Sequence, residues 1–168
     1  AHLHPQAVGA EPNAPVSLRL TAASDCSDAV LHGKVRLGCA AGWTVEPAEL
    51  SFMLPSGEYL DAEVTVTPPS AVAAGLYPVR AELALTGSHP SMPLSWRQAV
   101  EDVCVVSVAA APDDKVLRWV SEPAPVDVAA GETAWLTATV GSDAHADLAV
   151  EAHLISPWGT WEWLGPAA

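Results

Sequence analysis

The chain has 168 residues, of which 50% are hydrophobic and only 16% are charged, so it can bury a sizeable core and does not have the composition of a disordered segment. Twenty acidic residues against seven basic ones give a net charge of −13. Because this charge repels phosphate backbones and anionic headgroups, nucleic acid and acidic membranes are not expected as partners.

The sequence predicts no membrane span, because it contains no apolar run of about 18 residues. No basic region followed by a hydrophobic stretch opens the chain, and a signal peptide removed from a longer polypeptide stays an open alternative. The chain opens at Ala1 without methionine and closes on Gly-Pro-Ala-Ala, and we therefore expect a fragment of a larger, bacterial polypeptide. Its compartment, cytoplasmic or secreted, stays open.

The first 14 residues contain two histidines and two prolines without periodicity, and they predict a tail or linker. After them, apolar and polar residues alternate, which indicates strands with one buried face. The expected strands are residues 16–21, 30–39, 50–54, 59–67, 75–85 and 99–109. This number and spacing of strands predict an immunoglobulin-like β-sandwich over residues 15–111.

A short polar joint at residues 110–114 precedes a second unit over residues 115–168. Its turn at residues 129–132 and the strand after it repeat, in outline, the turn at residues 55–58 and the strand that follows. We predict an all-β chain of two tandem sandwiches. Only four or five strands are expected in the second, so we predict that it is truncated, and its open sheet edges could pair with another copy to form a dimer.

Four segments of the first unit carry a family resemblance. They are residues 42–47 (Gly-Trp-Thr-Val-Glu-Pro), 54–58 (Leu-Pro-Ser-Gly-Glu), 64–69 (Val-Thr-Val-Thr-Pro-Pro) and 74–79 (Ala-Gly-Leu-Tyr-Pro-Val). In this order they resemble the NEW domain associated with α-galactosidases and other glycosidases. The resemblance implies a sandwich that accompanies a glycosidase and does not itself catalyse.

Residues 154–162 (Leu-Ile-Ser-Pro-Trp-Gly-Thr-Trp-Glu) resemble the C-terminal β-rich region of actinobacterial family 38 glycoside hydrolases, the α-mannosidase class. This resemblance implies a parent enzyme whose zinc ligands and carboxylates lie in an upstream catalytic domain. None of those residues maps onto this chain, so no cofactor is expected in the fragment itself. The implied partner is the catalytic domain of the same polypeptide.

Tryptophans are the candidate carbohydrate-binding residues. Trp158, Trp161 and Trp163 form the densest aromatic cluster, and Trp161 and Trp163 share one face if their segment is extended. Trp96, beside Arg97 on a polar loop, is the tryptophan most expected to be isolated and exposed. Flat exposed rings can stack on sugars, but packing in a core or domain interface is the favoured alternative for the cluster.

Other groups of polar residues give weaker signals. His145, Asp147 and His153 have loose metal-type spacing, but a metal site needs more converging ligands, and we predict a solvated loop. The adjacent carboxylates at residues 101–102 and 113–114 diverge in an extended chain and do not form a glycosidase pair. We predict no catalytic residue and no metal site.

Three cysteines, Cys26, Cys39 and Cys104, are an odd number without metal-type spacing, which favours buried reduced thiols. Both Cys39 and Cys104 continue the apolar parity of their strands, so a bridge between facing sheets is the alternative.

The sequence therefore predicts a non-catalytic accessory region of a bacterial, α-mannosidase-like glycosidase that supports the catalytic domain. Two alternatives stay open: a carbohydrate-binding module and a cell-surface adhesion or scaffold segment.

Overall fold

The computed structural model describes residues 1–24, 29–86, 100–111, 113–148, 150 and 152. Within these ranges the chain is all-β: every assigned element is a strand. None of the described segments is a helix that could cross a membrane.

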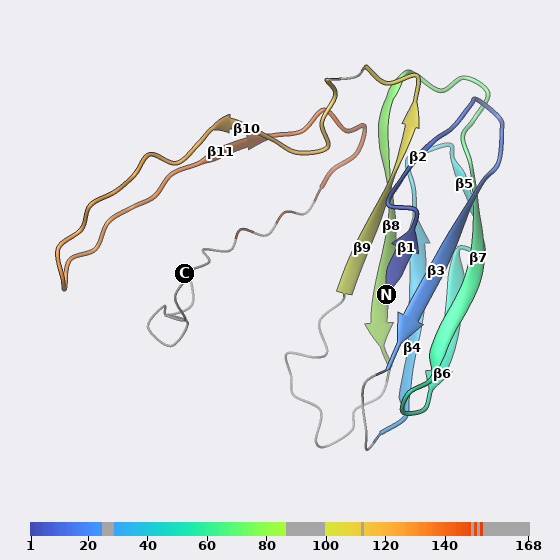
Figure 1. Ribbon diagram of the computed structural model, residues 1–168. Coiled ribbons are helices and arrows are strands. Elements are labelled where there is room, and N and C mark those ends of the chain that lie inside the picture. The colour runs from blue at the N-terminus through green and yellow to red at the C-terminus, as the bar shows by residue number, and fades with distance from the viewer. Residues whose placement is uncertain (25–28, 87–99, 112, 149, 151, 153–168) are drawn as a thin grey trace.

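Nine of the strands form two sheets that face each other, and two more form an arm that projects from one end (Figure 1). The four-stranded sheet has the order β1 (His2–His4), β3 (Val16–Ala23), β7 (Tyr59–Thr67), β5 (Thr44–Glu46). The five-stranded sheet has the order β2 (Ala7–Gly9), β9 (Val100–Val108), β8 (Gly75–Leu85), β4 (Leu31–Gly38), β6 (Glu49–Leu54). The arm contains β10 (Arg118–Ser121) and β11 (Thr139–Gly141).

The six strands expected in the first unit are all present, and two of them, β7 and β8, have the predicted bounds. The apolar rows point inward as alternation requires: β3 has the buried positions Leu18, Leu20 and Ala22, with the more exposed Arg19 and Thr21 between them. The all-β, sandwich prediction is therefore confirmed for the first unit. The division into residues 15–111 and 115–168 stays a prediction.

Residues 1–14 differ from the expected tail. They form β1, which pairs antiparallel with β3, and β2, which pairs parallel with β9. Strands of three residues are too short to show a period of two, and so the sequence pattern did not reveal them. Leu3 is 1% exposed and belongs to the core, so the first residues of the chain are part of the sandwich.

The strand β5 was also not predicted, and it explains how the sandwich is closed. The segment β1–β2 crosses from the four-stranded to the five-stranded sheet at Pro5, and the segment β5–β6 makes the same crossing at Pro47. Each of these prolines follows a cis peptide bond. Because both crossing segments supply edge strands to both sheets, they join the two sheets along both sides.

The core lies between the sheets and is almost entirely aliphatic. The four-stranded sheet contributes Leu3, Leu18, Leu20, Ala22, Val64 and Val66, and the five-stranded sheet contributes Val35, Leu37, Phe52, Leu54, Tyr77, Val79, Ala81, Cys104, Val106 and Val108. The cross-strand ion pairs lie on the outer faces, where Arg19 pairs with Asp61, and Lys34 and Arg36 both pair with Glu49. These cross-strand pairs are exposed and stabilise the fold only slightly.

One carboxylate holds the N-terminal strand against the opposite sheet. The backbone N–H of the buried Leu3 donates to Asp102 Oδ2 of β9 at 2.6 Å. We expect Asp102→Ala to lower the free energy of unfolding by about 1–3 kcal/mol, because it removes the charged acceptor of a buried donor. Asp102→Asn keeps an acceptor and should lose less. Urea unfolding of both variants tests this, and equal losses would contradict it.

Candidate functional site

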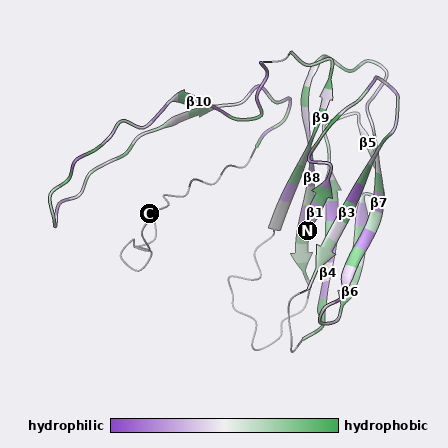
Figure 2. Cartoon of the chain, in the orientation of Figure 1, coloured by the Kyte–Doolittle hydropathy of each residue, from purple (hydrophilic) through white to green (hydrophobic). Residues whose placement is uncertain are grey.

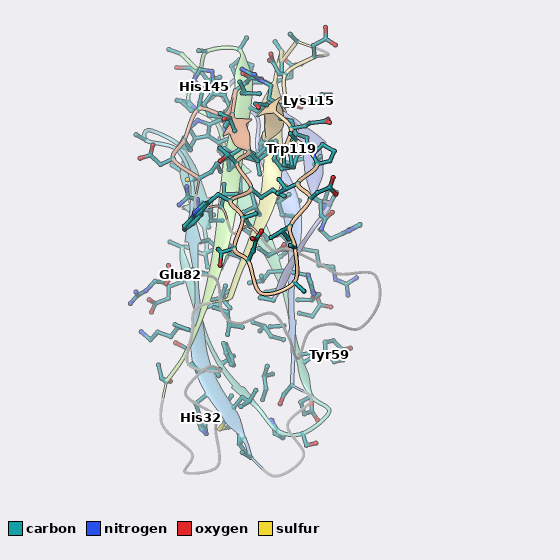
Figure 3. All side chains as sticks on the ribbon, turned by 90° about the vertical axis from the view of Figure 1, so that its left-hand side faces the viewer. His32, Tyr59, Glu82, Lys115, Trp119 and His145 are labelled. Carbon is teal, nitrogen blue, oxygen red and sulfur yellow. The ribbon has the colours of Figure 1, made fainter. Side chains whose placement is uncertain are left out.

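The described residues that differ most from an ordinary sandwich lie where the arm meets the start of β8. Here the loop after β11 returns to the sandwich, and Figure 3 shows His145 and Lys115 at this end of the molecule, far from His32. We call the contacts of residues 143–145 with the rest of the chain the joint.

Three aromatic rings contact one another in a row at the joint, the Trp43 and Tyr77 planes tilted by 35° and the Tyr77 and His145 rings stacked. The Trp43 and Tyr77 ring centroids are 4.7 Å apart, and the Tyr77 and His145 centroids are 4.9 Å apart with nearly parallel planes, at 13°. The Tyr77 hydroxyl donates to the Ala73 carbonyl at 2.8 Å, which fixes the middle ring. The row runs from the buried Trp43 to the loop histidine, so it connects the core to the arm.

The backbone of the start of β8 completes this contact. The N–H of His145 donates to the Leu76 carbonyl at 2.8 Å, and Ala144 forms a parallel bridge with Leu76. A Cβ built on Gly75 would overlap the His145 imidazole, and Gly75 has a φ of +152°. Glycine is required here because both the conformation and the close approach of the ring exclude a side chain.

Asp143 holds the two ends of the arm together. Its carboxylate accepts from the Lys115 backbone N–H at 3.3 Å and pairs with the Arg118 guanidinium at 3.2 Å, while its own N–H donates to the Lys115 carbonyl at 3.0 Å. The hydrogen bond from Arg118, with a further one from Lys115, holds the pKa of Asp143 below its ordinary value of 3.8.

This carboxylate gives a pH prediction. Because the folded-state pKa of Asp143 is lowered, its contribution to stability is present above the unfolded pKa and is lost as pH falls through the folded pKa. Carbon NMR of the side-chain carboxyl should therefore show an Asp143 titration midpoint below 3.8. Arg118→Gln should raise that midpoint towards the ordinary value. An identical midpoint in both proteins would contradict the assigned cause.

The arm exposes apolar side chains along its whole described length. Hydrophobic stretches recur along it in Figure 2, and its large apolar residues have exposed fractions between 43% and 89%. They are Leu117, Trp119, Val120, Val126, Val128, Trp135, Leu136 and Val140. The described part of the arm has two short paired strands and no buried apolar residue, whereas four or five strands are expected from the sequence over residues 115–168.

The predicted carbohydrate-binding residues Trp96, Trp158, Trp161 and Trp163 lie outside the described residues, and their role stays a prediction. Of the weak metal cluster, His145 contacts Tyr77 in the joint, and His153 is also outside the described residues. No group of three potential metal ligands occurs within the described ranges.

The outer face of the four-stranded sheet has a shallow open depression lined by His4, Arg19, Asp61 and Glu63, among others. Asp61 is paired with Arg19, and this hydrogen bond lowers the pKa of the Asp61 carboxyl. A general acid of a glycosidase needs a raised pKa. The lowered pKa of Asp61 therefore suits a surface ion pair and not proton donation.

The two described cysteines are free, and the suggested bridge is absent. Cys104 lies on β9 and Cys39 comes directly after β4, and both strands belong to the five-stranded sheet with β8 between them, so the two cysteines do not come from facing sheets. Burial, with the nearby Asp102 charge, raises the pKa of Cys104 to about 11, and burial also raises the pKa of Cys39. Such thiols are poor nucleophiles at neutral pH.

Reasoning from sequence did not find the joint. The alternation predicts that Tyr77 lies on the strand 75–85, and the sequence predicts a solvated loop at His145, but nothing in their spacing indicates that the rings stack. The glycine at the start of β8 is the one signal that could have pointed to a close approach.

Comparison with known proteins agrees with this architecture. Residues 10–86 match the family model described as the NPCBM-associated, NEW3 domain of alpha-galactosidase. The match supports the predicted NEW-type domain, and a NEW3 domain is an accessory domain associated with glycosidases. No curated protein matches the chain.

Solved structures that resemble the chain share only 11–12% sequence identity with it. WR4, a C. elegans MSP family member, has a TM-score of 0.38 over 65% of this chain and 95% of its own. The class 5 fimbriae chaperone CfaA has a TM-score of 0.39 and a chaperone–tip adhesin complex of CFA/I fimbriae biogenesis one of 0.41. Each of these two alignments covers 71% of this chain and 60% of the other, and such low scores carry no functional argument.

Proposed function

We propose that the chain is a non-catalytic accessory region of a bacterial glycoside hydrolase, and that its sandwich supports the catalytic domain of the same polypeptide. The observation that carries this proposal is the match of residues 10–86 to the NEW3 domain. A parent of the α-mannosidase type is the finer part of the proposal, and it rests on residues 154–162. In such a parent, zinc and the catalytic carboxylates belong to the upstream domain.

The charge and packing of the described region suit a supporting role. Among the described residues, the carboxyls of Glu49, Asp61 and Asp143 all have a lowered pKa because lysine or arginine side chains donate hydrogen bonds to them. Carboxylates held in this way remain ionised near neutral pH and cannot serve as the protonated acid of a glycosidase. The closely packed sandwich core suits a rigid spacer or platform.

Two tests separate this function from its alternatives. The coding sequence flanking the chain should encode a glycosidase catalytic domain upstream, and a surface protein without one would overturn the proposal. Removing residues 1–168 from the parent enzyme should then shorten its thermal half-life and leave the KM of a small aryl glycoside unchanged. Unchanged half-life and activity would also overturn it.

Glycan binding is the second candidate function, and the exposure of two tryptophans in the arm favours it: Trp119 is 58% exposed and Trp135 is 89% exposed. Titration of the chain with mannose- and galactose-containing oligosaccharides separates the two functions. We expect no saturable binding. A Kd of about 1 mM or lower that is lost in Trp135→Ala or Trp161→Ala would replace the supporting role with a binding role.

A further inference from the structure

A small open cleft lies beside the joint, between the five-stranded sheet and the loop that returns from the arm. Its volume is about 210 Å³, and it is lined by Gly38, Cys39, Pro78, Arg80 and Ala146. The sheet supplies the end of β4 and two residues of β8, while Ala146 belongs to the returning loop and follows His145, which marks this end of the molecule in Figure 3. The joint holds this loop against the sheet and so provides one wall of the cleft.

Strand register places Arg80 beside Gly38 on the outer face of the sheet. Arg80 lies directly opposite Gly38 of β4 on one side and opposite Val103 of β9 on the other. Its neighbours on β8, Val79 and Ala81, are fully buried in the core, so Arg80 points away from it. A Cβ built on Gly38 would meet nothing within 4 Å, which is independent evidence that the space beside Arg80 is open.

Among the described arginines, Arg80 is the one without a partner. The others each pair with a carboxylate: Arg19 with Asp61, Arg36 with Glu49, and Arg118 with Asp143. Arg80 is half-buried, and its guanidinium forms no ion pair or hydrogen bond with any residue that the structure describes. Glu82, the next carboxylate along the same face of β8, does not pair with it either. In a chain with twenty acidic residues and seven basic ones, this leaves Arg80 available to an external anion.

The chemistry of the cleft favours a carboxylate. A guanidinium presents a planar fork of N–H donors that matches the two oxygens of a carboxylate. Of the described residues that line the cleft, only Arg80 is charged, so a phosphate dianion would lack the further cations that it needs. Burial raises the pKa of the Cys39 thiol, which is therefore uncharged near neutral pH and does not repel an anion.

The size and walls of the cleft limit what carries the carboxylate. Pro78, Ala146 and the Cys39 thiol are apolar or weakly polar, and they suit carbon and not a second charge. The volume is below the roughly 300–1,000 Å³ of pockets for drug-sized ligands, so a single ring or a short acyl chain is the expected body.

We propose that this cleft is a binding site for a small monocarboxylate, with the Arg80 guanidinium as the group that binds the carboxylate. Gly38 leaves the space for the ligand, and Ala146 forms the wall on the side of the arm. A uronate sugar and a short-chain acid both have this chemistry, and their relative affinities identify the source. The proposal goes beyond the supporting role and does not depend on it.

Proton–nitrogen NMR spectra of the full chain, titrated with sodium glucuronate and with sodium butyrate, test the proposal. The backbone amide signals of Gly38, Arg80 and Ala146 should shift with a saturable Kd on the order of 1–10 mM for at least one of the two acids. Tighter binding of glucuronate assigns the site to a uronate sugar, and tighter binding of butyrate assigns it to a short-chain acid. Glucuronamide keeps the ring but lacks the charge, and it should cause no saturable shift.

Two variants remove the site in different ways. Arg80→Gln removes the charge and should weaken binding by about ten-fold or more, because a charged hydrogen bond is lost. Gly38→Leu fills the cleft from a position with open space around its Cβ, and it should abolish binding although the charge remains. Arg19→Gln is the matched control, since it removes an arginine from the other sheet and should leave the Kd unchanged. The amide signals of β3 report whether each variant is folded.

Three results would overturn the proposal. The absence of a saturable shift with either acid up to about 50 mM would show that the cleft does not bind carboxylates. The same Kd in Arg80→Gln and the wild type would show that the guanidinium does not hold the ligand. Equal shifts with glucuronamide and glucuronate would show that the charge is not recognised.

Discussion

Trp43→Ala should destabilise the protein more than any other single tryptophan change in the described region, by about 3–5 kcal/mol. Trp43 is only 8% exposed, belongs to the core cluster and packs against Tyr77 with the ring centroids 4.7 Å apart. Its removal leaves a cavity beside Tyr77 and takes away one end of the row of rings, so the joint loses support as well. Urea unfolding followed by far-ultraviolet circular dichroism measures the change.

Trp135→Ala is the control for this experiment because it removes the same side chain from a site that is 89% exposed. We expect a change within about 0.5 kcal/mol. A similar loss in both variants would mean that Trp43 contributes no more than a surface tryptophan and would contradict the packing described for the core.

Gly33→Val should be the most damaging glycine substitution in the sandwich interior, with a loss of about 1–3 kcal/mol or more. Gly33 lies on β4 directly opposite Phe52 of β6 and Leu85 of β8. A Cβ at this position would overlap the Phe52 ring and would come 2.6 Å from the Ala84 carbonyl oxygen. The ring can rotate away only by leaving the core, and the backbone oxygen cannot move without disturbing the sheet.

Gly38→Ala is the matched control on the same strand, since a Cβ at Gly38 meets nothing within 4 Å. It should leave stability unchanged or raise it slightly, because alanine restricts the unfolded chain. A double-mutant cycle of Gly33→Ala with Phe52→Leu should recover part of the loss. Additive losses would show that the ring is not the obstacle, and a stable Gly33→Val protein would contradict the predicted overlap.

These two sites also bear on the proposed supporting role. That role requires a rigid domain, and both Trp43 and Gly33 lie in the packed interior. The joint extends the same packing through Tyr77 to His145. We therefore expect the loss of Trp43 to weaken the contacts that hold the arm to the sandwich. Hydrogen exchange of residues 143–148 in Trp43→Ala would report this effect directly.

Much of the first unit could be predicted because its strands are long enough to show their period. In β3, β7 and β8, apolar residues alternate with polar ones over eight or more positions, and each row belongs to one face of a sheet. Turns were predicted for a similar reason: Gly57 occurs where a positive φ is needed, and such local requirements can be read from neighbouring residues. The NEW-type resemblance rested on this same local pattern.

Features that depend on contacts between distant residues could not be read in this way. The three-residue strands β1, β2 and β5 owe their existence to neighbours elsewhere in the chain, and Asp102 gains its role only because β9 lies beside β1. The stacking of Tyr77 on His145 became evident only from the ring positions. Alternation states which side of a strand is apolar, but only the folded chain decides which strand lies opposite and whether that apolar side is covered.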